Sequence, residues 1–218
     1  NLLKLRNISP TLRSKNILMS RMQNNLPVYN GGLGENPLPI PNYLLQSVKT
    51  NMWKKEYTNI EGTDTFKKTI MNIIPNINNI MVGNGLKELI FCLTMAWKDK
   101  IFIPTPCWLT YLENMKLLNK SYVEIPCMYD KNYKLTPGLL ETYLNYHNGH
   151  DSLLFLNNPS NPTGHVYTKS ELLDLIECLK YYNVTVFCDE IYSELAHTEF
   201  TSLSELYDKC IIGSSLSN

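Results

Sequence analysis

One stretch, residues 153–192, constrains the fold of this chain more than any other. The apolar run Leu153–Leu156 is followed directly by eight polar or rigid residues, Asn157–Gly164. Two prolines in this loop fix φ and remove backbone donors, while its asparagines offer both amide donors and carbonyl acceptors. A short surface turn is the alternative reading, but a turn needs only one or two such residues. The loop therefore indicates a polar binding element at the end of a buried strand.

A helix and a second strand follow this loop. Thr168 and Glu171 have the spacing of a capping box, and leucine and isoleucine recur behind them at helical intervals. The next apolar run ends at Asp189. The order strand, loop, helix, strand is typical of an open α/β sheet, in which ligands bind at the strand ends.

The same alternation extends over most of the chain and predicts a layered α/β domain with a largely parallel sheet. We expect helices near residues 86–97, 108–118, 136–146 and 168–182, and strands near residues 80–82, 101–103, 121–125, 152–156, 184–189 and 210–214.

The beginning of the chain lacks a core-forming pattern. We interpret residues 1–50 as an N-terminal arm with a substrate-side loop, and residues 51–218 as the main domain. Helices are expected at residues 14–22 and 41–50, and at 64–74 behind a capping Thr63. The glycine- and proline-rich stretch 30–41 is either a linker or a close approach of backbone to a neighbour.

Composition excludes several classes of function. The 218 residues are 44% hydrophobic and 18% charged, with a formal net charge of zero, so a globular protein without a nucleic-acid partner is expected. No segment is typical of a signal peptide or membrane span, and we expect a cytoplasmic protein without a membrane partner. Six cysteines form no CxxC pair, which favours buried free thiols over disulfides or a metal site.

Chemistry is concentrated at the strand ends. Two glycines in Val82–Glu88 start a helix whose free amides form an anion site, although such glycines are common at strand–helix turns and are a weak signal alone. Trp108 follows a Pro-x-Pro turn and either stacks on a planar ligand or belongs to the core. Asp189, three residues before Tyr192, faces a cation or a set of donors, or else caps a helix. Together these positions describe a site for a flat, phosphorylated heteroaromatic molecule.

At this point the sequence resembles a known family, the fold-type-I pyridoxal-phosphate enzymes. It is most similar to the class I/II aminotransferases related to aspartate and histidinol-phosphate aminotransferases. Asn161–Gly164 resembles the family's Asn-Pro-x-Gly loop and Asp189–Tyr192 its Asp-x-x-Tyr motif, and the resemblance runs from about residue 31 to 218. It implies a three-layer αβα large domain behind the arm, with the C-terminal small domain absent.

The resemblance also implies roles for individual residues. Asp189 would pair with the protonated pyridine nitrogen, which keeps the ring electron-accepting. Tyr192 and Asn161 would bind the 3-oxygen, and one X-Pro bond of the loop is expected to be cis. The further cofactor contacts would be Trp108 by stacking, Gly85, Leu86 and Lys87 at the phosphate, Ser215 and Ser217 before the catalytic lysine, and Tyr57 from the partner subunit of a homodimer. Leu33 and Gly34 would lie near the substrate carboxylate.

Asn218 is the principal departure from the family. It stands at, or next to, the position of the Schiff-base lysine, and asparagine cannot form that bond or act as the general base. Three explanations stay open: a true substitution, a chain cut here, or an omitted modified lysine. The expected function is amino-group transfer between an amino acid and a 2-oxo acid. The alternatives are a non-catalytic cofactor-binding remnant, and a decarboxylase or lyase of the same fold.

Overall fold

The computed structural model of the chain describes residues 10–29, 38–74 and 76–216. Its internal contacts divide the chain into two units, Asn1–Lys55 and Glu56–Asn218. The first unit contains α1 (Pro10–Gln23) and α2 (Asn42–Asn51), close to the helices expected there. No residue of α2 is buried, and its leucines and valine are exposed to solvent. The second unit contains the sheet and the residues from which a site can be built.

The second unit begins with α3 (Asp64–Met71), whose first turn is capped by the side chain of Thr63. This cap confirms the predicted start. The helix ends at Met71, three residues before the predicted end at Ile74.

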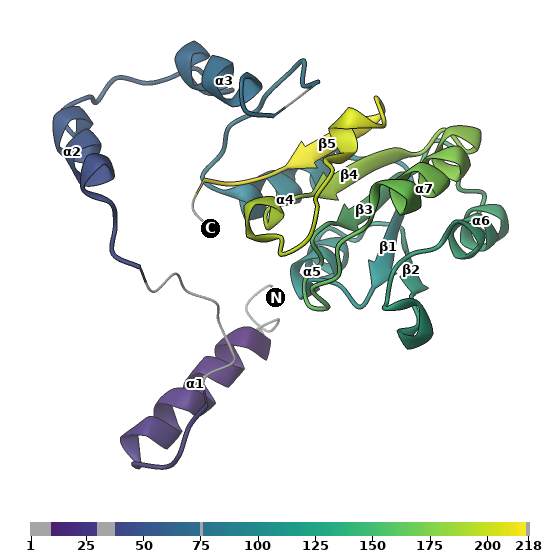
Figure 1. Ribbon diagram of the computed structural model, residues 1–218, viewed down its shortest axis with the longest axis horizontal. Helices are drawn as coiled ribbons and strands as arrows, with labels where there is room; N and C mark the ends of the chain where they lie inside the picture. Colours follow the sequence, from purple (N-terminus) through teal and green to yellow (C-terminus); the bar gives the residue numbers. More distant parts are fainter. Residues whose placement is uncertain (1–9, 30–37, 75, 217–218) are drawn as a thin grey trace. The chain divides into compact units, whose positions relative to one another are not determined.

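Five parallel strands form the sheet (Figure 1). They are β1 (Ile101–Thr105), β2 (Tyr122–Pro126), β3 (Leu153–Asn157), β4 (Thr185–Asp189) and β5 (Cys210–Gly213), arranged in the order β2-β1-β3-β4-β5. Each lies where the sequence predicted a strand. The parallel arrangement places the carboxyl ends of all five strands at one edge of the sheet.

The strand predicted at residues 80–82 is wrong. These residues have no strand geometry, and the amide of Val82 bonds instead to the carbonyl of Glu61 at 3.2 Å. Met81 is 63% exposed, so the apolar run is not buried as an inner strand of a parallel sheet is. Apolar residues alone did not distinguish it from a connecting segment.

Helices cover both faces of the sheet, which confirms the three-layer arrangement (Figure 1). One face packs against α4 (Leu86–Ala96) and α5 (Leu109–Leu117), and the other against α6 (Pro137–Tyr146) and α7 (Lys169–Tyr181). Successive strand residues pack against opposite helix layers. Ile101 and Ile103 face α4 and α5, whereas Phe102 faces α6 and α7. Among its described residues the unit also has short 3₁₀ turns at Tyr129–Lys131 (η2), Ser193–Leu195 (η3) and Leu203–Glu205 (η4).

The six cysteines are all free thiols, as expected, but only Cys127 and Cys188 are buried. Within the described ranges, no helix combines the length and the hydropathy needed to cross a membrane.

Candidate functional site

Asp189 is the most deeply buried acid at the carboxyl edge of the sheet. It ends β4 and is 3% exposed. The phenol of Tyr111 donates a hydrogen bond to its Oδ2, and the amide of Ile191 donates to its Oδ1 at 3.2 Å. Burial raises the pKa of Asp189, while these two hydrogen bonds act in the opposite direction by stabilising the carboxylate.

No basic side chain neutralises this acid within the part of the chain that the structure describes. The ion pairs there join Lys67 to Glu61 and Asp64, and Lys134 to Glu171. A buried carboxylate without a cation is costly, and a positively charged ligand group removes that cost. Asp189 therefore fits a protonated ring nitrogen.

Asn161 and Tyr192 lie together, as the family resemblance implied. The side-chain amide of Asn161 donates to the phenol oxygen of Tyr192 at 3.2 Å, and both residues are half-buried. They come from different elements, Asn161 from the loop after β3 and Tyr192 from the turn after β4. An amide and a phenol side by side can both donate hydrogen bonds to a ring oxygen that loses its proton.

The loop that carries Asn161 is closed by its own backbone. The amide of Gly164 donates to the carbonyl of Ser160 at 2.7 Å, and the amide of Ser160 donates to the carbonyl of His165 at 2.9 Å. Gly164 has φ of +71°, a conformation that favours glycine. The bonds Asn158–Pro159 and Asn161–Pro162 are both cis, whereas one was expected.

Trp108 lies beside the residues that hold Asp189. It is the N-cap residue of α5, is half-buried, and contacts the ring of Tyr111 edge to face at a centroid distance of 5.6 Å. The ammonium group of Lys87 lies 5.6 Å from the centre of the Trp108 ring. Trp108 is half-buried and packs against the apolar cluster that contains the buried Tyr111.

The start of α4 lies near the end of β5. A Cβ atom on Gly213 would come within 2.9 Å of Leu86 Cδ1, which brings the first turn of α4 to this edge of the sheet. Gly85 caps the helix with φ of +122°, and a Cβ there would meet open space. The amides of the first turn have no intrahelical acceptors, so they fit a phosphate. The carboxylate of Glu88 already accepts from the amide of Asn84 at 2.7 Å.

Two of the remaining predicted residues lie in the part of the chain that the structure describes. Ser215 follows β5 and is half-buried, while Tyr57 is fully exposed and contributes nothing to a site in its own chain. Leu33, Gly34, Ser217 and Asn218 lie outside the described residues.

Tyr111 is the site residue that the sequence reasoning missed. It lies three residues after Trp108, and that spacing places both side chains on one face of α5. The spacing was visible in the sequence, but the hydrogen bond to Asp189 joins residues 78 positions apart and could not be read from it.

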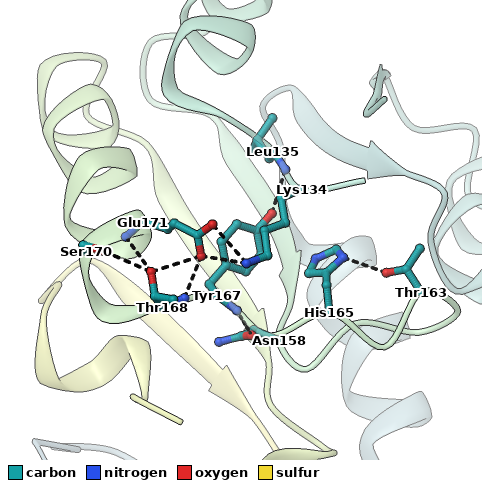
Figure 2. A network of polar contacts seen from close by, with 9 residues as sticks. All are labelled: Lys134, Leu135, Asn158, Thr163, His165, Tyr167, Thr168, Ser170 and Glu171. Carbon is teal, nitrogen blue, oxygen red and sulfur yellow. Dashed lines mark hydrogen bonds and ion pairs between the residues drawn. The ribbon is translucent and has the colours of Figure 1, made fainter. Parts of the chain in front are cut away.

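A second polar network lies behind the loop, on the side of α7 (Figure 2). Tyr167 is buried, its amide donates to Asn158 Oδ1 at 3.0 Å, and its phenol accepts from the amide of Leu135 at 2.7 Å. Thr168 and Glu171 form the predicted capping box, and Glu171 also binds Lys134. A cavity of about 350 Å³ opens here, lined by Lys131 and by Lys134, which is paired with Glu171. The buried acid and the amide–phenol pair lie instead at the sheet edge, which is therefore the candidate site.

The chain belongs to the aminotransferase class I and II family, whose model matches residues 32–217. A protein from Rickettsia typhi named "Probable aspartate/prephenate aminotransferase" is 30% identical over 207 residues, which cover 88% of this chain and 51% of the relative. An aspartate aminotransferase from Bacillus sp. (strain YM-2) is 28% identical over 192 residues, covering 82% of this chain and 48% of the relative.

Solved structures show the same fold. The aspartate aminotransferase from Rhizobium meliloti superposes with a TM-score of 0.85 at 23% identity, covering 98% of this chain and 57% of that one. The enzyme from Thermotoga maritima gives the same TM-score and identity, covering 99% and 61%. The chain thus has the fold-type-I aminotransferase fold and spans about half the length of the curated relatives it matches.

Proposed function

We propose that the protein is a pyridoxal-phosphate-dependent aminotransferase that moves an amino group between an amino acid and a 2-oxo acid. One observation carries the proposal: Asp189 is buried without a basic partner among the described residues, at the same sheet edge as the Asn161–Tyr192 pair. This arrangement supplies an anion for a cationic ring nitrogen and a donor pair for a ring oxygen. Membership of the family agrees with that chemistry.

Each residue has a task toward the cofactor. Asp189 holds the proton on the ring nitrogen, Tyr192 and Asn161 bind the 3-oxygen, and Trp108 stacks against the ring. The amides of Gly85, Leu86 and Lys87 bind the phosphate, with Ser215 and Ser217 behind them. When bound, pyridoxal phosphate supplies a carbonyl that takes up the amino group and a ring that accepts electrons from the substrate.

Substrate and assembly belong to the same proposal. The names of the relatives make aspartate the first amino donor to test and prephenate the first acceptor. Leu33 and Gly34 contact the substrate carboxylate, and Tyr57 reaches the phosphate in the partner subunit of a homodimer. The exposure of Tyr57 supports this arrangement, because a side chain that serves a partner is free in its own chain. The protein acts in the cytoplasm.

Cofactor binding is the first test. Pyridoxamine phosphate, which needs no lysine for attachment, is titrated into the 218-residue chain by calorimetry. We expect saturable binding by the wild type and none by Asp189→Ala. The matched control is Asn145→Ala. Asn145 lies on α6 and accepts a hydrogen bond from the phenol of Tyr182, so this variant is expected to bind the ligand as the wild type does. Absence of binding by the wild type, or equal binding by Asp189→Ala, would contradict the proposed site.

Amino transfer is the second test. The protein is mixed with pyridoxal phosphate and aspartate, and formation of the amine form of the cofactor together with the 2-oxo acid is followed by absorption and mass spectrometry. Release of carbon dioxide or of a cleaved side chain would favour a decarboxylase or lyase. Cofactor binding without any turnover would favour the non-catalytic alternative, and borohydride reduction followed by peptide mapping would show whether a lysine takes part.

A further inference from the structure

Asn157 joins the two halves of the candidate site. It is the last residue of β3 and lies in register with Asp189, the last residue of β4. Its side-chain amide donates to the backbone carbonyl of Asp189 at 2.9 Å. Its side-chain carbonyl accepts from the backbone amide of Asn161 at 2.6 Å. One side chain therefore contacts both the strand that carries the acid and the loop that carries the amide.

These contacts form a closed ring. Asn157 binds the backbone of Asp189 and of Asn161, the side chain of Asn161 binds Tyr192, and Tyr192 follows Asp189 by three residues in the chain. A ring of this kind sets the separation between its members, because none can move without lengthening a hydrogen bond. The separation that it sets is the one between Asp189 and the Asn161–Tyr192 pair.

We infer that Asn157 is a positioning residue. It sets the spacing between Asp189, which binds the ring nitrogen of the cofactor, and the Asn161–Tyr192 pair, which binds its 3-oxygen. The inference rests on the proposed function. In the pyridine ring of the cofactor, one carbon atom lies between the nitrogen and the carbon that carries the 3-oxygen. The protein groups that bind these two positions therefore need a fixed separation. Binding groups that are misplaced by a fraction of an ångström lose much of their effect.

The loop does not depend on Asn157 to stay folded. Asn158 holds it from behind by accepting the amide of Tyr167 at 3.0 Å (Figure 2). The amide of Asn158 also donates to the carbonyl of Asp189 at 3.0 Å, which keeps the loop and β4 joined through backbone alone. Loss of the Asn157 side chain is therefore expected to change the spacing within the site and leave the loop in place.

The test compares Asn157→Ala and Asn157→Asp with the wild type and with Asn145→Ala. The alanine variant loses both contacts, and the aspartate variant keeps an acceptor for Asn161 but loses the donor to Asp189. Two quantities are measured with pyridoxamine phosphate: its affinity by calorimetry, and the pH at which the 3-oxygen of the bound ligand ionises, by absorption. Melting temperatures without ligand report on folding.

We expect Asn157→Ala to weaken binding roughly ten-fold, the size of about one net hydrogen bond. The 3-oxygen should ionise at higher pH in this variant, because Tyr192 and Asn161 are no longer positioned to donate hydrogen bonds to it. Asn157→Asp should lie between the alanine variant and the wild type, and Asn145→Ala should match the wild type. A weaker affinity with an unchanged ionisation, or no change in either, would overturn the inference while leaving the proposed function intact. Failure of the wild type to bind the ligand would overturn both.

Discussion

Tyr111 donates its phenolic hydrogen to the carboxylate of Asp189, and both side chains are almost completely buried, at 2% and 3% exposure. Burial raises the pKa of Tyr111 well above its ordinary value, and the neighbouring Asp189 raises it further. The phenol therefore stays protonated and acts only as a donor to this acid. Tyr111 is in turn held edge to face against Phe155 of β3, at a centroid distance of 5.2 Å.

Tyr111→Phe is expected to weaken the binding of pyridoxamine phosphate by about ten-fold or more, since a hydrogen bond to a charged group is lost. It should also alter the pH dependence. The Tyr111 bond lowers the pKa of Asp189, so its loss raises that pKa, and affinity should start to fall at a higher pH as the solution is acidified. Calorimetric titrations across pH measure both effects. Tyr182→Phe, which breaks a bond to Asn145, is the control, and identical pH profiles for the two variants would count against this role.

Asp189→Asn is expected to make the protein more stable at neutral pH, although it abolishes cofactor binding. Burial gives Asp189 a folded-state pKa above its unfolded value, so ionisation costs stability as pH rises through the window between the two. Asparagine carries no such cost, and its amide can still bond to Tyr111 while its carbonyl accepts from Ile191. The melting temperature should rise by about 2–4 °C for each kcal/mol gained in the free energy of unfolding. This rise should be present at neutral pH and vanish in acid. A variant that melts below the wild type at neutral pH would refute the prediction.

Glu190→Ala is expected to destabilise the fold by about 1–3 kcal/mol, because it leaves buried donors without an acceptor. Glu190 is 4% exposed, and it accepts from the amide of Leu203 at 2.9 Å and from the hydroxyl of Ser202 at 2.8 Å. It thereby ties η4 to the end of β4. Denaturant unfolding measures the loss, and Glu190→Gln, which retains an acceptor, should lose much less. Equal losses for both variants would show that the contacts to η4 are not the cause.

His165 is expected to make the protein less stable as pH falls below the ordinary histidine range. Burial, with a contribution from Lys134, lowers its pKa from 6.5 to about 4, so the folded state holds the neutral ring that contacts Thr163 at 2.7 Å. Unfolding takes up a proton at pH values between these two, and the stability is lost across that window as pH falls. His165→Gln should flatten this part of the stability profile by on the order of 1 kcal/mol, allowing for its partial exposure. Urea unfolding of both proteins at stepped pH checks it, and parallel profiles would exclude His165 as the source.

Local patterns determined most of the fold of this protein. The helices and five of the six predicted strands follow from periodicity and capping residues, which act over a few positions, as the capping box of Thr168 and Glu171 illustrates. The strand expected at residues 80–82 failed because an apolar run does not reveal whether a neighbouring strand is available to pair with it. The motifs around Asn161 and Asp189 were likewise visible in the sequence, since each is contained within a few residues.

Sequence alone thus marked the candidate site residues that lie in short motifs, because strand ends, helix starts and short motifs are set by near neighbours in the chain. Only the tertiary structure decided how those residues are held. The bond from Tyr111 to Asp189 and the register that places Asn157 beside Asp189 join segments dozens of residues apart. Such contacts depend on the order of strands in the sheet and on the helix that packs across it, and neither is encoded within any one segment.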